Sequence, residues 1–392
     1  MKRTAAISLA GFCAFFPFYA PQPLLPTLAT EFQTSAARIS LLLTASTLGV
    51  ALVAPLMGIL ADRIGQKRVI VPAVLLLALP SLLVARATSL GELLVWRFVQ
   101  GVLTPGIVVV VPAYINEERR EGVGKATGAY VSGTVLGGFF GRLIAGFVAS
   151  QFSWRWAFVA LALPCLVGGV AVAWWLPEGR RVRGASSAAA TARAMVRHLG
   201  NGRLLATYAV GFCVLFSMLA TFTYVNFYLA APPYLLSPAA LGLLFVVYLA
   251  GAVAAPIAGH AIDRTGHRLT ITVAYAGAIG GILLTLVASL PVIMAGLALC
   301  CTAVFVAQSA STSYIGSVAV EARSAAVGLY VLFYYVGGSA GSAFPAYFWN
   351  RGGWPACVAL IAGVQILTIA LAASFWSPSR SRQPADLLSS KN

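Results

Sequence analysis

Two arginines lie inside long apolar stretches of this 392-residue sequence, where a charged side chain is costly. Arg97 follows Glu92 by 5 residues, and Arg142 precedes Ser150 by 8. A helix rises 1.5 Å per residue, which would place them about 7.5 and 12 Å from the helix end. An arginine near the bilayer centre costs roughly 2.5 to 3.5 kcal/mol and is tolerated mainly beside a cavity or a partner. The two arginines therefore either line a cavity that attracts an anionic or electron-rich ligand, or reach outward to Glu31 and Glu92.

Acidic side chains are missing from the centres of the apolar stretches. The ten carboxylates lie at the ends of stretches or between them: Glu31, Asp62, Glu92, Glu117, Glu118, Glu121, Glu178, Asp263, Glu321 and Asp386. A proton crossing a membrane is often carried by an embedded carboxylate, so any carrier here would be an end-of-helix acid or the ligand itself. The sequence also has no phosphate loop, zinc cluster or nucleophile triad. We therefore expect no cofactor, no metal and no enzymatic activity.

Polar and aromatic side chains recur at helical spacing along other apolar stretches. The sets are Phe15, Tyr19 and Gln22; Ser217, Thr221, Tyr224 and Tyr228; Gln308 and Thr312; and Tyr330 and Tyr334. Each set is a candidate wall of a ligand cavity. Packing between helices or an interfacial aromatic belt explains any single set equally well.

The composition explains which elements hold these side chains. Hydrophobic residues make up 60% of the chain and charged residues 9%, against about 25% charged in soluble proteins. The bilayer is therefore the solvent, and a spanning helix needs roughly 20 apolar residues. Twelve such runs cover approximately residues 4–28, 39–61, 69–86, 91–114, 123–150, 153–176, 204–229, 238–262, 268–289, 291–313, 322–348 and 354–376. The predicted fold class is an all-α membrane protein with twelve transmembrane helices.

The basic residues predict the orientation of these helices. Four of the 26 lysines and arginines lie in loops on one side (Arg38, Arg86, Arg155 and Arg351), and Arg97 and Arg142 lie within helices. The other 20 lie on the opposite side, together with both termini and the central loop. Because basic loops stay in the cytoplasm, both termini are predicted to be cytoplasmic, and the net charge of +16 does not indicate a nucleic-acid partner. A signal peptide at Lys2 and Arg3 is the alternative for the first run, but the internal repeat argues against it.

The chain repeats itself at a shift of about 200 residues. Gly11, Phe12 and Cys13 return as Gly211, Phe212 and Cys213; Gly128, Gly137 and Gly141 return as Gly328, Gly337 and Gly341; Trp154 returns as Trp354. Six helices separate the copies, so the halves have the same orientation and a cavity is expected between them. The predicted parts are an N-terminal half (1–176), a central loop (177–203), a C-terminal half (204–377) and a tail (378–392). Residues 188–199 form either a short surface helix or a flexible linker.

One loop carries a resemblance to a known family. Gly58-Ile59-Leu60-Ala61-Asp62-Arg63-Ile64-Gly65-Gln66-Lys67-Arg68 resembles the loop between helices 2 and 3 of the major facilitator superfamily. A second copy returns as Gly259, Asp263, Arg264 and Gly266. The glycines permit a tight turn, and the resemblance implies that both loops act as a conformational gate.

Two further matches resemble the drug:proton antiporters of this superfamily. Arg97-Phe98-Val99-Gln100-Gly101 is similar to the helix-4 arginine motif associated there with proton coupling, and Gln100 shares a helical face with Arg97. Residues 133–142 are similar to the helix-5 motif of the acriflavin-sensitivity branch. They depart from the usual motif at Gly138, where proline is usual, and at Arg142, where glycine is usual.

The resemblance implies a secondary active transporter of the bacterial inner membrane. We expect a monomer surrounded by lipid that exports a small organic substrate by alternating access, with proton antiport. The alternative is an organic-anion transporter or exchanger that uses Arg97 and Arg142, and a lipid flippase or a sensor on the same scaffold is a third possibility.

Overall fold

The computed structural model describes residues 2–116, 123–178, 188–319 and 321–376. The N-terminal half contains α1 (Lys2–Phe15), η1 (Gln22–Leu24), α2 (Leu25–Glu31), α3 (Ala36–Ile64), α4 (Gln66–Leu76), α5 (Ala78–Arg86), α6 (Leu90–Leu103), α7 (Pro105–Val108), α8 (Val110–Asn116), α9 (Val123–Gln151) and α10 (Trp154–Trp175). The rest contains α11 (Ala188–Leu199), α12 (Gly202–Ala230), α13 (Pro238–Leu243), η2 (Leu244–Val246), α14 (Val247–Leu284), α15 (Leu290–Val318), α16 (Arg323–Ala343) and α17 (Pro345–Phe375).

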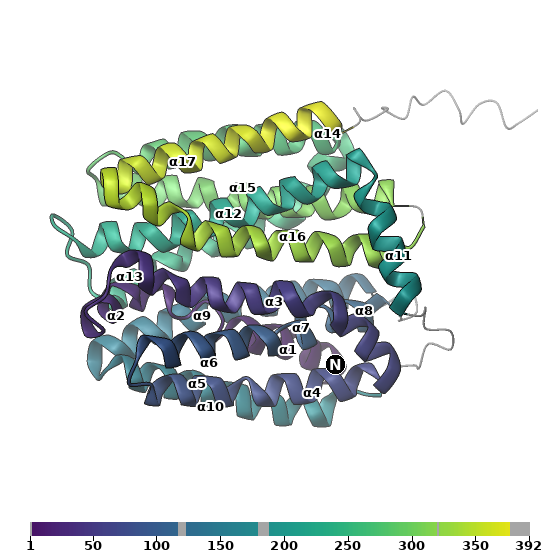
Figure 1. Cartoon of the computed structure of the whole chain (residues 1–392), viewed down its shortest axis with the longest axis horizontal. Helices are drawn as coiled ribbons and strands as arrows, with labels where there is room; N and C mark the ends of the chain where they lie inside the picture. Colours follow the sequence, from purple (N-terminus) through teal and green to yellow (C-terminus); the bar gives the residue numbers. More distant parts are fainter. Residues whose placement is uncertain (1, 117–122, 179–187, 320, 377–392) are drawn as a thin grey trace, which may run out of the picture.

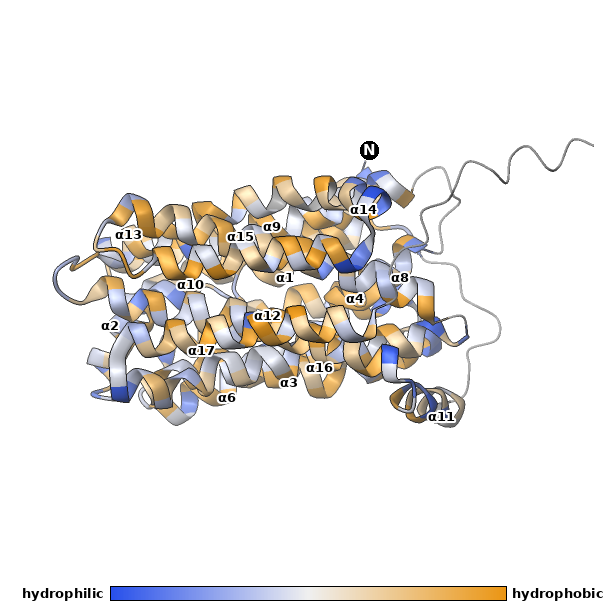
Figure 2. Ribbon diagram, turned by 90° about the horizontal axis from the view of Figure 1, so that it is seen from above, coloured by the Kyte–Doolittle hydropathy of each residue, from blue (hydrophilic) through white to orange (hydrophobic). Residues whose placement is uncertain are grey.

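The long helices run roughly parallel to one another as two groups, with the N-terminal half below and the C-terminal half above in Figure 1. Apolar residues cover the lengths of the helices, and hydrophilic residues gather toward their ends (Figure 2). We call the end of the bundle where α12 begins and α3 ends the basic end, and the other the far end. At the basic end lie Lys2, Arg63, Arg203 and Arg264.

Nine helices among the described residues are long and apolar enough to cross a membrane. The other three predicted spans differ from simple apolar helices. The first is interrupted after Phe15, and the eighth is divided among α13, η2 and the start of α14. The eleventh, α16, is rich in glycine, serine and tyrosine. Two long helices are kinked where the sequence places a boundary between spans: α14 leaves helical geometry at Gly266, and α17 does so at Gly352 and Gly353.

The sequence predicts an unbroken first helix over residues 4–28, and this prediction is wrong. The chain leaves the helix after Phe15 and resumes regular structure at Gln22. Pro17, Pro21 and Pro23 fall in or beside this gap. Proline lacks the N–H that continues a helix and its ring clashes with the preceding turn, so backbone carbonyls in the gap are left for other donors.

The repeated glycines bring helices into close contact, as their four-residue spacing predicts. A Cβ added at Gly137 or Gly141 of α9 would overlap the carbonyl oxygens of Phe12 and Phe16. In the other half, Gly337 and Gly341 of α16 lie in the same way against Phe212 and Phe216 of α12. Each pair lets two backbones approach closely, as in membrane helix dimers.

The central loop contains a helix, so the first of the two alternatives for residues 188–199 is right. Helix α11 lies across the basic end in Figure 1. His198 Nε2 lies 3.3 Å from the Ala322 carbonyl oxygen, and Arg197 pairs with Glu321 at 3.2 Å. The Met195 side chain lies next to Gly328. Helix α11 is therefore docked on the start of α16.

Candidate functional site

Arg97 holds the interrupted part of the first helix. Its side chain is fully buried and donates from Nη1 to the Pro17 carbonyl oxygen at 3.1 Å. It also donates to the Phe18 carbonyl oxygen and to Gln100 Oε1. Gln100 in turn donates to Ser81 Oγ at 3.2 Å. The guanidinium thus supplies the hydrogen bonds that the helix break removes, which compensates much of the cost of burying it.

Arg142 lies where the two halves meet, and it is also fully buried. Its Nε donates to Gln22 Oε1 at 2.6 Å and its Nη1 to the Gly138 carbonyl oxygen at 2.7 Å. Three aromatic rings enclose the guanidinium, with centroids 4.8, 4.4 and 4.6 Å from its carbon: Tyr19 of the N-terminal half and Phe245 and Tyr248 of the C-terminal half. These cation–π contacts span the interface between the halves.

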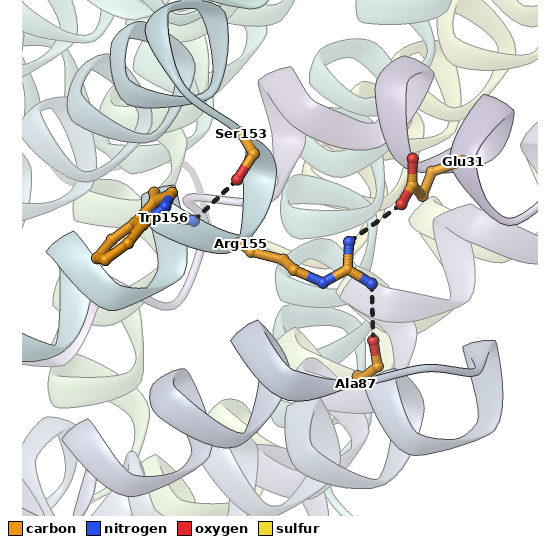
Figure 3. A network of polar contacts seen from close by, with 5 residues as sticks. All are labelled: Glu31, Ala87, Ser153, Arg155 and Trp156. Atoms are coloured by element: carbon orange, nitrogen blue, oxygen red, sulfur yellow. Dashed lines mark hydrogen bonds and ion pairs between the residues drawn. The ribbon is translucent and has the colours of Figure 1, made fainter.

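Neither arginine reaches a rim carboxylate, so the pairing with Glu31 and Glu92 is not observed. Glu31 pairs with Arg155 at 3.1 Å, and Arg155 also donates to the Ala87 carbonyl oxygen (Figure 3). The hydrogen bond from Arg155 holds the pKa of Glu31 below its usual value. Glu92 accepts from the backbone N–H of Thr88 at 2.7 Å. Both carboxylates therefore stabilise the far end of the N-terminal half.

Hydroxyl groups join the two halves toward the far end. Thr47 Oγ1 lies 2.8 Å from Ser339 Oγ, and Thr44 Oγ1 lies 3.0 Å from Ser342 Oγ. Further out, Ser40 Oγ lies 3.4 Å from the Tyr224 hydroxyl. These contacts cover about two turns of α3 and close this end against α12 and α16.

Helices α9 and α13 complete the closure. A Cβ added at Gly146 would overlap the Pro238 carbonyl oxygen, and one at Gly242 would lie 2.7 Å from the Arg142 carbonyl oxygen. Ser150 Oγ accepts from the Ala239 N–H at 2.9 Å.

Several glycines toward the basic end face open space. Among the described residues, no atom lies within 4 Å of a Cβ added at Gly58, Gly128 or Gly259. Both predicted gate loops form tight turns, with φ of 100° at Gly65 and 81° at Gly266, which favours glycine. The charged members of the loops that are largely exposed are Asp62, Arg63, Arg68, Asp263 and Arg264, while Lys67 is half-buried. The side-chain hydrogen bonds described above between the two halves lie toward the far end, which is the pattern expected of one state of an alternating pair.

Aromatic side chains meet between the halves near Arg142. Phe15 stacks with Tyr19 at 5.9 Å between centroids, and Phe18 meets Tyr335 of the C-terminal half at 6.3 Å. Tyr334 lies 5.5 Å from Tyr335. Phe15 and Tyr19 of the first predicted set and Tyr334 of the last set therefore belong to one aromatic cluster.

Of the other predicted residues, Tyr330 extends this cluster and the rest lie apart from it. Tyr330 stacks on Tyr334 at 5.8 Å and covers Gly211, while Thr221 is buried in α12. Tyr224 belongs to the far-end closure, and Gln308 is half-buried in α15. His267 is half-buried, 5.4 Å from the Tyr314 ring.

The sequence predictions missed the residues that close the far end. Ser40, Thr44 and Thr47 follow helical spacing along α3, and Phe245 and Tyr248 are three residues apart. This spacing was the available signal, but similar spacing occurs wherever helices pack. Which hydroxyl faces the other half depends on the packing of the halves.

Two helical halves around an interface that is closed at one end define a membrane transporter of the alternating-access class. A family model described as Major Facilitator Superfamily matches residues 7–234 and 212–391. The chain belongs to this superfamily of secondary transporters, so it is a transporter and not an enzyme. The match confirms the predicted all-helical fold of two repeated halves.

Similar proteins carry several different functions. The inner membrane transport protein YnfM of Escherichia coli (strain K12) is 35% identical over 373 residues, which are 94% of this chain and 89% of YnfM. The nucleoside transporter NupG has a TM-score of 0.78 at 14% identity, covering 95% of this chain and 100% of NupG. The human organic anion transporter MFSD10 has a TM-score of 0.73 at 18% identity, covering 95% and 99%. At these identities, the two solved structures show the fold alone.

Proposed function

We propose that this transporter exports a small organic compound from the cytoplasm in exchange for protons. The observation that carries the proposal is the asymmetry of the interface, since the hydrogen bonds described between the halves and the rings around Arg142 lie toward the far end. If the basic end faces the cytoplasm, this state loads substrate from inside. The charge distribution supports this orientation, with both termini cytoplasmic in the inner membrane. YnfM, which is named as an inner membrane protein, supports the location.

The aromatic cluster supports an aromatic or otherwise planar organic substrate. Phe15, Phe18 and Tyr19 of the first span contact one another, and Phe18 meets Tyr335 of α16, which lies next to Tyr334. Rings of this kind favour offset or edge contacts with another ring, worth about 0.5 to 1.5 kcal/mol beyond area burial. The substrate would contact both halves and so bind differently in each state, as coupled transport requires.

A proton gradient should accelerate export if protons are exchanged. In liposomes with the basic end inside and external pH lower than internal pH, we expect faster substrate efflux than without the gradient. Glu31 and Glu92 are held by Arg155 and Thr88, which leaves exposed Asp62 as the end-of-helix candidate. Asp62→Asn should abolish the acceleration while membrane insertion stays normal.

The control for this experiment is Asp263→Asn, which changes the second copy of the gate loop. It should impair the gate while leaving the response to the pH gradient intact. Transport that is indifferent to the gradient would reject antiport and leave a facilitator or an exchanger. An accelerated rate that Asp62→Asn does not change would assign the proton to the substrate instead.

A second candidate function is transport of an organic anion. Two buried guanidiniums without a carboxylate partner in the described residues favour it, and MFSD10 shows that this fold serves organic anions. All three guanidinium nitrogens of Arg142 are already hydrogen-bonded, so an anion would have to replace Gln22 or Tyr248. Arg97 is engaged by backbone carbonyls and is less available.

Binding measurements on Arg142→Met separate the two functions. An anion carrier should lose about tenfold or more in affinity for anionic compounds and keep its affinity for neutral analogues, because the charge-assisted contact is removed. Arg97→Met serves as the comparison, since it should mainly lower thermal stability. Equal losses for anionic and neutral compounds in Arg142→Met would contradict the organic-anion function.

A further inference from the structure

A second basic feature lies away from the interface between the halves. A pocket of about 800 Å³ opens at the basic end of the C-terminal half, where α12 begins and α15 and α17 end. Arg203 and Arg268 line it, together with Asn201, Ser317 and Trp376. Among the described residues, no carboxylate lines the pocket. The pocket is therefore positively charged at the level where these helices leave the membrane.

The wall of the pocket is preformed. Trp376 is buried, stacks on Tyr314 at 4.5 Å between centroids, and donates from Nε1 to Thr207 Oγ1 at 3.1 Å. His267 meets the edge of Trp376 at 6.4 Å, and its Nε2 lies 3.0 Å from Ser313 Oγ. These contacts join four helices, so the pocket does not depend on one mobile side chain.

The internal repeat gives Arg203 an equivalent arginine in the N-terminal half, and that arginine makes a different contact. Arg3 is equivalent to Arg203 and Tyr114 to Tyr314, each 200 residues apart. The Arg3 guanidinium lies over the Tyr114 ring, 4.8 Å from its centroid. In the C-terminal half, Trp376 stacks on the equivalent ring, that of Tyr314, and occupies the place of the arginine. Arg203 consequently lines the pocket.

The residues around the pocket indicate a ligand that carries both a negative charge and a hydrocarbon chain. Two arginines suit phosphate oxygens, which they bind in a planar, bidentate way. A volume of 800 Å³ is large for a single phosphate ion. Among the lining residues, Phe375 exposes 48% of its surface, as expected of a side chain that contacts an acyl chain. Basic pockets between helices on the cytoplasmic side are suited to anionic lipid headgroups.

We propose that the pocket of Arg203 and Arg268 binds the phosphate headgroup of an anionic phospholipid. The lipid ties the start of α12 to the ends of α15 and α17 in the C-terminal half. Its phosphate takes hydrogen bonds from the two guanidiniums and from Ser317, and its acyl chains lie along Phe375. This site is separate from the transport pathway and does not depend on which substrate is carried.

Thermal unfolding of the purified full-length protein tests the proposal. Phosphatidylglycerol added to the detergent micelles should raise Tm by about 3 °C or more, whereas phosphatidylcholine should not. Arg203→Gln with Arg268→Gln should remove most of that rise. The matched control is Lys2→Gln with Arg193→Gln, which removes two exposed charges outside the pocket and should keep the full rise. If the double variant does not fold, Arg268→Gln alone should show a reduced rise.

Two results would overturn the proposal. An equal phosphatidylglycerol effect in wild type and in the pocket variants would place lipid binding elsewhere. The second measurement uses inorganic phosphate in place of the lipid. If phosphate alone raises Tm as much as the lipid does, and if the rise needs Arg203 and Arg268, the ligand is a soluble phosphate compound. No response of Tm to phosphate, with a lipid response that needs both arginines, is the expected result.

Discussion

Gly146→Val is expected to reduce transport by about a hundredfold or more while leaving the protein folded. Gly146 of α9 lies against the Pro238 carbonyl oxygen of α13, where even a Cβ would overlap. The valine side chain therefore prevents the far end from closing. It has no steric overlap once the two halves separate at that end. A difference of about 3 kcal/mol between the two states shifts their ratio more than a hundredfold. Trapped with the far end open, the transporter cannot complete its cycle.

Two measurements distinguish this trap from misfolding. Transport is assayed in proteoliposomes, and far-end opening by labelling of Ala145→Cys with a membrane-impermeant maleimide. Ala145 is fully buried in the closed state, and all six native cysteines are buried, so background labelling is low. The matched control is Gly363→Val in α17, where no described atom lies within 4 Å of the added Cβ. Normal transport by Gly146→Val, with Ala145→Cys still protected, would show that this contact does not close the far end.

The repeat made much of the fold predictable, because duplicated glycines carry information about packing. Gly137 and Gly141 recur as Gly337 and Gly341, and both pairs lie against carbonyl oxygens of a neighbouring helix. A backbone contact of this kind tolerates no side chain, so it leaves a clear pattern in the sequence. The gate loops are predictable for the same reason, since positive φ at Gly65 and Gly266 favours glycine.

The partners of the buried arginines were harder to predict. A charge in an apolar stretch shows that a partner exists, and the obvious candidates for Arg97 and Arg142 were carboxylates. The structure instead uses carbonyl oxygens of the broken first helix, the Gln22 amide and aromatic rings. Backbone carbonyls are present at every position, so only the break at Pro17 marks those available to Arg97. The prolines were visible in the sequence, but their consequence depended on the approach of α6.

A disulfide between Thr47→Cys and Ser339→Cys should abolish transport, and reduction should restore it. The two hydroxyl oxygens lie 2.8 Å apart across the halves, so their Cβ atoms lie near the roughly 3.5 to 4.5 Å that a disulfide needs. The bond would hold α3 to α16 at the closed far end. Alternating access requires these helices to separate, so the oxidised protein should retain the closed state without transport.

The controls follow from the geometry of α3. Each single-cysteine variant should transport at nearly the same rate with or without oxidant, because the native cysteines are buried. Leu48→Cys combined with Ser339→Cys places the thiol one residue along α3 on an exposed face, and it should not crosslink. Complete crosslinking of the Thr47→Cys and Ser339→Cys pair with transport unchanged would mean that the far end does not open by separating α3 from α16. In that case the opening would have to occur between α9 and α13, where Gly146→Val acts and where Arg142 holds the rings of the opposite half.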